Sequence, residues 1–436
     1  MRFAIAAALV AACYAPNAEV GAPCSPSGDC PSGQRCDDSQ SPPTCVSSSA
    51  LGSSDGDGGI VVDAPAVIDG LPVATDAGGA VTCNKDGDCD SGNCSQYAGT
   101  CVPIFDTIYV DGSSGHDGGA CTQDAPCASI TYAMSQIDGA RRIVHVADGD
   151  YGESLSIDSG LGGSTDTVVV IGATDQGAEL EGGGVSVHGA DVRFENFGID
   201  SAGSDAVSLD SGCTLVLAGV TITDAGNDGV KAADQHSNDV SIFFSAVTDS
   251  DNLGVHLKSG SLTMDADYIG GNTGGIELQN GCQASIQNTS VVGNGGASST
   301  VGGIVTLDSS KLTSFTFNTV ADNTTNGSRP GGVLCGMSAS NDSFAANNSI
   351  FSGNTSPQTD CPTSYSLFGS DGDVGTGDGD IAGDPAFKDE MDGDFHITPA
   401  SAARNAADPQ ATLDHDYDGQ SRPQGPARDI GADEIQ

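Results

Sequence analysis

The chain has 436 residues, of which 59 are Asp or Glu and only 14 are Lys or Arg, so its formal net charge is −45. A chain this acidic repels a phosphate backbone, which excludes nucleic acid as a partner. It also repels anionic polysaccharides unless local cations intervene. With 62 Gly, no Trp and 5% aromatic residues, the composition is typical of a chain rich in turns rather than of a helical enzyme with a large aromatic core.

The N-terminus predicts export. A positive start, Met1-Arg2, precedes the apolar run 3–12, which is too short to span a membrane. The run ends in Val-Ala-Ala before Cys13 and resembles a bacterial lipobox, in which this Cys becomes the lipidated first residue. An ordinary signal peptide with an incidental Cys is the alternative. Because Tyr14 replaces the Asp of inner-membrane retention, the resemblance implies a lipid-anchored protein of the outer membrane or cell surface of a Gram-negative bacterium.

The other 14 of the 15 cysteines support export, because an even number is typical of disulfide pairing in an oxidising compartment. Eight of them lie in two short blocks, neither long enough to bury a core. No Cys-x-x-Cys pair occurs in either block, which favours disulfides over zinc, the alternative. The blocks loosely resemble Dickkopf-like or disintegrin-like cysteine-rich modules. Their cysteines are Cys24, Cys30, Cys36 and Cys45, then Cys83, Cys89, Cys94 and Cys101.

The main domain follows the second block and opens with a strand that ends at Asp111 and a loop rich in Gly and Asp. Pro126 then precedes a short helix, and the next strand ends in Gly-Asp-Tyr at Tyr151. This order resembles the opening of right-handed parallel β-helix proteins of the pectate-lyase-like class, which implies an all-β solenoid. Cys121 and Cys127 fall inside the opening loop, and we expect them to pair with each other.

A repeat runs through the rest of this domain. Each copy has a small residue, then Val or Ile, any residue and an apolar residue. A turn and one or two further short apolar stretches, here called bursts, follow. Later bursts are bounded by Asn, as in NTSVVGN and NTVADN. Such irregular periods are typical of a solenoid whose coils stack at about 4.8 Å. An all-β sandwich, the alternative, would need wider hairpin signals and a more aromatic core. The Val or Ile anchors lie 22, 23, 25, 21, 28 and 29 residues apart, at Val185, Val207, Val230, Val255, Ile276, Ile304 and Val333.

The C-terminal segment contains Asp384-Pro385, Asp418-Gly419, Arg422-Pro423 and Asp-Ile-Gly-Ala at 429–432. These pieces resemble a segment of bacterial β-helix proteins named the choice-of-anchor Q domain, although Asp433 stands where that family has an aromatic residue. We expect the segment to cap the last coil, because an open β-helix end exposes an aggregation-prone edge. The predicted organisation is a signal peptide with its lipidated Cys (1–13), a cysteine-rich module (14–46), a disordered linker (47–81), a second module (82–103), the β-helix (104–383) and the capping segment (384–436).

One outward-facing column stands out for chemistry, because successive strand residues alternate between faces. The residue after the anchor reads Ser208, Lys231, His256 and Glu277 on consecutive coils, and Lys258 lies two positions beyond His256. Within roughly 10 Å, these residues would form a cationic patch in an acidic chain. The patch favours a saccharide site, with Lys231 or Lys258 as base or carboxylate clamp and His256 as acid/base partner. Solvated surface with weak Lys–Glu pairs is the alternative.

No cofactor is predicted, and structural calcium is the one candidate metal. Asp414, Asp416 and Asp418 form the first half of an EF-hand-like loop, but Gly425 at its twelfth position has no carboxylate to supply.

The remaining cysteines lie in the repeats. Cys213 and Cys282 share a column three coils apart, roughly 14 Å, which is too far for a disulfide, so we expect buried thiols. Cys335 should point inward near the end of the stack and bond to Cys361.

These features together predict a surface lipoprotein that displays a β-helix, as a binding or structural module for polysaccharide or another cell-envelope component. The alternative is a polysaccharide lyase or epimerase that uses the face of Lys231, His256 and Lys258. The lyase motifs of the class are not recognisable in this chain, and a fold alone does not give function.

Overall fold

The computed structural model describes residues 34–37, 44–47, 83, 89, 94–95, 97–102, 104–173, 177–200, 203–233, 236–335, 344–369 and 375–436. The chain divides into two units, Met1–Ile60 and Val61–Gln436. The first contributes an antiparallel hairpin of β1 (Gln34–Asp37) and β2 (Thr44–Ser47), in which Cys36 and Cys45 are register partners. The predicted lipidation site Cys13, the cysteines Cys24 and Cys30 and most of the linker lie outside the described residues.

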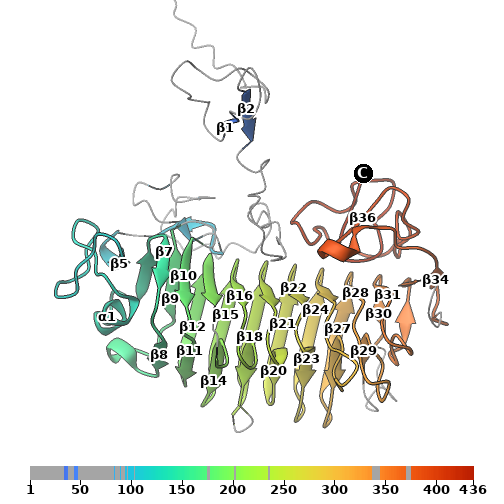
Figure 1. Cartoon of the computed structure of the whole chain (residues 1–436), viewed down its shortest axis with the longest axis horizontal. Helices are drawn as coiled ribbons and strands as arrows, with labels where there is room; N and C mark the ends of the chain where they lie inside the picture. Colours follow the sequence, from blue (N-terminus) through green and yellow to red (C-terminus); the bar gives the residue numbers. More distant parts are fainter. Residues whose placement is uncertain are drawn as a thin grey trace, which may run out of the picture. The chain divides into compact units, whose positions relative to one another are not determined.

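The second unit contains a right-handed parallel β-helix, whose stacked coils form three parallel sheets, one on each face. This confirms the predicted fold class (Figure 1). Each full coil adds one strand to sheet 1, then to sheet 2, then to sheet 3. Sheet 1 comprises β8 (Leu155–Asp158), β11 (Val185–His188), β14 (Val207–Asp210), β17 (Val230–Ala232), β20 (Leu253–Leu257), β23 (Gly274–Leu278), β26 (Ile304–Thr306) and β29 (Val333–Leu334). Sheet 2 comprises β5 (Thr107–Val110), β6 (Ile143–Val146), β9 (Val168–Gly172), β12 (Asp191–Glu195), β15 (Thr214–Ala218), β18 (Asn238–Phe243), β21 (Gly260–Asp265), β24 (Gln283–Gln287), β27 (Lys311–Thr316), β30 (Ala346–Asn347) and β32 (Thr363–Ser364). Sheet 3 comprises β7 (Gly149–Tyr151), β10 (Ala178–Glu181), β13 (Phe197–Asp200), β16 (Thr221–Thr223), β19 (Ala246–Thr248), β22 (Tyr268–Gly270), β25 (Ser290–Val292), β28 (Thr319–Ala321), β31 (Ile350–Ser352), β33 (Leu367–Phe368) and β34 (Ile381–Ala382).

The predicted anchors are register partners along sheet 1, from Val185 to Val333, and their side chains are buried. A slip of one residue would turn each strand's apolar side chains toward solvent, so the burial pattern fixes the register. The turns after sheet 3 are joined by a ladder of buried Asn side chains, in which each amide donates to the next. These residues are Asn272, Asn294, Asn323 and Asn354.

The turn between sheets 2 and 3 has a residue with positive φ on eight consecutive coils. Gly and Asn adopt this left-handed conformation at low cost, whereas a Phe or Ala there is strained. The positions are Asn196, Gly219, Phe244, Ala266, Asn288, Phe317, Asn348 and Tyr365. This row of turns is the side of the β-helix on which the C-terminal segment lies.

The N-terminal end carries α1 (Ile130–Ser135), the loop closed by the predicted disulfide Cys121–Cys127, and the second cysteine module. Disulfides Cys83–Cys94 and Cys89–Cys101 cross-link this module, which has the hairpin β3 (Cys94–Ser95) and β4 (Thr100–Cys101). The predicted bond Cys335–Cys361 is also present, and Cys213 and Cys282 are buried free thiols as expected.

The second module is packed on the outer face of sheet 2. The Ser95 hydroxyl donates to the buried Glu195 carboxylate at 2.9 Å, and the Arg193 guanidinium lies over the Tyr97 ring, 5.0 Å from its centroid. Tyr97 also contacts Phe243, with ring centroids 5.9 Å apart. Burial raises the pKa of Glu195, although Arg193 and the bond from Ser95 oppose that rise.

The C-terminal segment packs along the side of the coils as far back as Asp265, so it covers more of the β-helix than the last coil that it is expected to cap (Figure 1). Its hairpin has β35 (Phe387–Asp389) and β36 (Asp394–Ile397). The His415 ring faces Phe244, with centroids 6.5 Å apart, and the Arg422 guanidinium lies 4.6 Å from the centroid of Phe317. These contacts cover strained turns of the row described above, which gives a physical reason for the lateral position. Among the residues placed by the structure, no helix has the length and apolarity needed to cross a membrane.

Candidate functional site

The predicted column lies on the outer face of sheet 1. Lys231 on β17 pairs in register with His256 on β20, and His256 pairs with Glu277 on β23. The column begins with Ser208 on β14, the register partner of Lys231. The structure therefore brings together the residues that the repeat pattern placed in one column.

His256 is held by a buried carboxylate. Its Nδ1 lies 2.9 Å from Asp228 Oδ2, and Asp228 is only 1% exposed. Asp228 also accepts from the backbone N–H of Leu253 at 3.2 Å. Burial raises the pKa of Asp228, but the bond from His256 and the Leu253 N–H outweigh burial, so this pKa lies below its ordinary value. Asp228 is thus an ionised carboxylate that fixes the orientation of the imidazole.

The other imidazole nitrogen is unpartnered. His256 Nε2 is buried and has no hydrogen-bond partner, and it lies 3.6 Å from Glu277 Oε1. When Asp228 accepts the proton of Nδ1, a neutral imidazole presents the lone pair of Nε2 toward Glu277. Two acceptors then lie close together with no donor between them.

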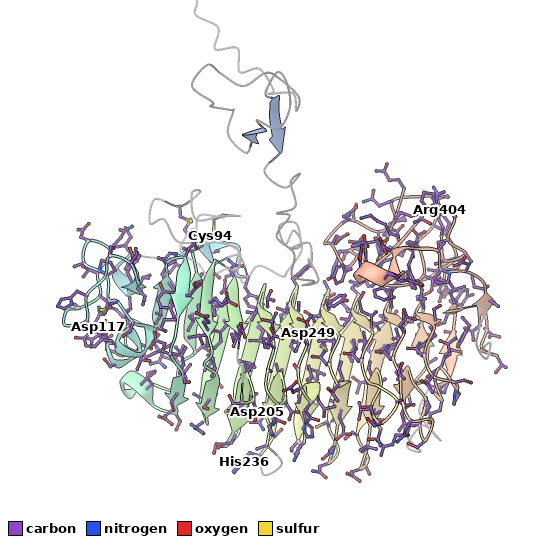
Figure 2. The ribbon with its side chains drawn as sticks, in the orientation of Figure 1. Cys94, Asp117, Asp205, His236, Asp249 and Arg404 are labelled. Atoms are coloured by element: carbon purple, nitrogen blue, oxygen red, sulfur yellow. A yellow bond between two sulfur atoms is a disulfide. The ribbon has the colours of Figure 1, made fainter. Side chains whose placement is uncertain are left out.

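Lys231 is paired with two carboxylates that the sequence columns did not include. Its Nζ lies 3.1 Å from Asp205 Oδ2 and 3.4 Å from Asp228 Oδ2; Figure 2 labels Asp205 among the green coils. Burial lowers the pKa of Lys231, but the hydrogen bond that Lys231 donates to Asp205 and the negative charges of Asp205 and Asp228 raise it above its ordinary value. A lysine whose pKa is raised stays protonated, so the geometry argues against Lys231 as a base.

The expected cationic patch is therefore not cationic, because acidic side chains from the preceding turns neutralise its positive charge. Asp205 and Asp228 each stand two residues before an anchor, a regular signal in the sequence that the outward columns did not use. Lys258 lies after β20 and, within the described part of the chain, forms no ion pair. It is the free cation of this face.

The predicted calcium loop does not gather its three carboxylates. The Asp414 side chain is 89% exposed and lies 3.1 Å from His415 Nδ1. Asp416 is fully buried, and its Oδ1 accepts the N–H groups of Asp418 and Gln420. One side chain thus points to solvent and the next to the interior, which is not the convergence that an EF-hand ion requires.

A protein-family model described as right handed beta helix region matches residues 183–356. Among solved structures, the crystal structure of pectate lyase Pel9A is similar, with a TM-score of 0.42 and 14% identity over 76% of this chain and 96% of that chain. No curated protein matches the sequence. The family match covers the coils that carry Lys231, His256 and Glu277, and it agrees with the observed β-helix.

Proposed function

We propose that this protein binds a polysaccharide of the cell envelope on the outer face of sheet 1. The observation that carries the proposal is the unpartnered Nε2 of His256, oriented by Asp228 and facing Glu277 at 3.6 Å. A buried acceptor without a partner costs free energy that a bound hydroxyl group would recover.

The ligand must bring hydrogen-bond donors. His256 Nε2 in the neutral imidazole and the Glu277 carboxylate are both acceptors. Adjacent hydroxyl groups of a sugar ring can donate to both and can also accept from Lys258. Gln279, which donates to Glu277, holds that carboxylate in place as Asp228 holds His256.

The charge at this face favours a neutral polysaccharide over a polyuronate. Lys231 and Lys258 supply two positive charges, whereas Asp205, Asp228 and Glu277 supply three negative charges, so the net charge is −1 with a neutral imidazole. The whole chain adds to this field with its net charge of −45. A sugar carboxylate would therefore be repelled.

The same proposal places the protein outside the cytoplasm, anchored in the outer membrane or at the cell surface by a lipid at Cys13. The lipobox-like sequence supports the anchor, and four disulfides in the second unit fit an oxidising compartment. Cys13→Ser should abolish incorporation of labelled fatty acid and release the chain in soluble form.

The binding test uses the soluble Cys13→Ser protein on immobilised neutral glycans and polyuronates. We expect binding to a neutral glycan and a loss of affinity of about tenfold in His256→Gln. Lys311→Gln, on the exposed start of β27 in sheet 2, is the matched control and should bind normally. The proposal would be contradicted if the Cys13→Ser protein bound glycans equally well with and without His256→Gln. A preference for polyuronates over neutral glycans would also contradict it.

The second candidate is a lyase or epimerase, and the hydrogen bond that His256 donates to Asp228 favours it because an oriented imidazole is a competent general base. In that case His256 would take the proton and Lys258 would hold the sugar carboxylate. Formation of an unsaturated product, seen by its ultraviolet absorbance, would identify a lyase. Exchange of solvent deuterium into a bound uronate would identify an epimerase.

A further inference from the structure

A second cluster of ionisable groups lies in the C-terminal segment, away from the sheet 1 face. His396 Nε2 and one carboxylate oxygen each of Asp418 and Asp433 all lie within 4.8 Å of one another. His396 belongs to β36, Asp418 to the loop that follows Asp416, and Asp433 to the last residues of the chain. Three separate stretches thus converge on one point.

The imidazole of His396 is oriented as a metal-bound histidine usually is. Its Nδ1 lies 2.6 Å from Asp394 Oδ1, and Lys388 holds the other oxygen of Asp394 at 2.7 Å. A histidine that binds a metal through one nitrogen commonly donates from the other nitrogen to a carboxylate. The Nε2 atom is left facing Asp418 Oδ2 at 3.1 Å. Ligand atoms of a tetrahedral zinc site with bonds of about 2.0–2.1 Å lie about 3.3–3.4 Å apart, close to this separation.

The carboxylate of Asp433 is also fixed. Its Oδ2 accepts the N–H of Ile397 at 2.8 Å, and its Oδ1 accepts the N–H of Glu434 at 2.9 Å. The side chain is 5% exposed. Each oxygen retains a lone pair that a cation could use.

A buried carboxylate oxygen beside this cluster has no partner. Asp416 is fully buried, and its Oδ2 forms no hydrogen bond, whereas its Oδ1 accepts two N–H groups. Asp416 lies two residues before Asp418 in the chain, and the charges of Asp418 and Asp433 act on it. An orphaned carboxylate oxygen in the interior indicates that a positive charge is missing nearby.

The buried cation of this region, Arg422, supplies only part of that charge. Arg422 forms its one ion pair among the described contacts with Glu434, at 3.1 Å. Its guanidinium nevertheless faces the negative charges of four buried carboxylates, those of Asp416, Asp429, Asp433 and Glu434. Arg422 and a protonated His396, whose charge acts on Asp433, supply two positive charges against these four carboxylates, which leaves an excess that a divalent cation would balance.

We propose that His396, Asp418 and Asp433 bind a divalent transition-metal ion of the Zn²⁺ type, with the free oxygen of Asp416 beside it. A nitrogen ligand with carboxylates favours Zn²⁺ or Mn²⁺ over Ca²⁺, which prefers oxygen ligands alone. The site differs from the predicted calcium loop, because Asp414 is excluded and His396 and Asp433 come from outside that loop. The ion would tie β36 and the C-terminus to the loop at Asp418, and so fix the segment that covers the side of the β-helix.

The test is equilibrium dialysis of the metal-depleted Cys13→Ser protein against Zn²⁺, Mn²⁺ and Ca²⁺ in turn, with the bound metal measured by mass spectrometry. We expect one equivalent of Zn²⁺ with no equivalent of Ca²⁺ at the same concentration. His396→Gln should lose this equivalent, and Asp394→Asn should weaken it about 10–100-fold through the orientation of His396. His188→Gln, a half-exposed histidine on β11 paired with Asp210, is the control and should retain full binding.

A spectroscopic measurement keeps the proposal falsifiable if His396→Gln does not fold. Co²⁺ added to the metal-depleted Cys13→Ser protein, with His396 intact, should give visible absorption bands typical of nitrogen and oxygen ligands. Added Zn²⁺ should displace the Co²⁺ and abolish these bands. No stoichiometric binding of Zn²⁺ or Mn²⁺, or equal binding in folded His396→Gln, would overturn the proposal. In either of these cases His396 would be an imidazolium held between Asp394 and Asp418.

Discussion

The Asn ladder predicts a large effect from one small substitution, Asn294→Ala. The Asn294 Nδ2 donates to the Ile269 carbonyl at 2.8 Å and to Asn323 Oδ1 at 3.0 Å. Its Oδ1 accepts the backbone N–H of Asn272 at 3.2 Å and the side-chain amide of Asn272 at 2.9 Å. The substitution removes all four bonds in a fully buried turn.

The magnitude follows from what is left unpaired. The N–H of Asn272 has no other bond among those of the described residues and would be orphaned, at a cost of about 1–3 kcal/mol. The bonds to Ile269 and Asn323 add about 1 kcal/mol each. We therefore expect the free energy of unfolding to fall by about 3–5 kcal/mol.

The assay is urea unfolding followed by circular dichroism, with Asn326→Ala as the matched control. Asn326 is exposed in a loop of the same region, and its loss should cost less than about 1 kcal/mol. The double mutant Asn272→Ala/Asn294→Ala should show coupling of about 0.5–3 kcal/mol, since the two side chains share a bond. If Asn294→Ala costs no more than the control, or if the pair is strictly additive, the ladder is not a cooperative element and the reasoning fails.

Three further predictions concern the tail and the free thiols. The pKa of His415 is raised to about 9 by its bond to Asp265, although burial opposes that rise, so this contact should stabilise the fold below pH 6.5 and lose that stabilisation as pH rises through 9. Because the pair is partly exposed, we expect about 1–2 kcal/mol, measured as a difference in urea midpoint between the wild type and His415→Gln at about pH 5.5 and about pH 10, each about one unit outside that window. An equal difference at both pH values would refute the linkage. Arg422→Met should lower the free energy of unfolding by about 3–5 kcal/mol, because it leaves Glu434 buried without its partner. A thermal unfolding midpoint no lower than that of the wild type would contradict this. Cys213 and Cys282 are buried, and burial raises the pKa of Cys282, so a thiol reagent should label both only in denaturant; labelling in the folded protein would show that the coils open locally.

The sequence by itself determined the solenoid and its register. Val185, Val207 and the later anchors recur at one position of a short pattern, and stacked identical positions are the only arrangement that buries them all. The free thiols Cys213 and Cys282 followed from the same register, because column and coil number set the distance between them. The disulfide Cys121–Cys127 followed instead from the place of both residues in one short loop, and the register placed Cys335 at the end of the stack, where Cys361 was the partner that remained. The column of Lys231, His256 and Glu277 was predicted for that reason as well.

Only the tertiary structure decided what surrounds that column and where the tail lies. Asp205 and Asp228 reach Lys231 from turns, whose side chains do not follow the alternation of a strand. His415 meets Asp265 across 150 residues, and Asp433 meets His396 from the last residues of the chain. These contacts depend on how two non-repeating surfaces fit, and a repeat predicts only contacts between its own copies. The sequence therefore predicted the periodic interior. The fold decided the sites that form where non-periodic segments pack against that interior.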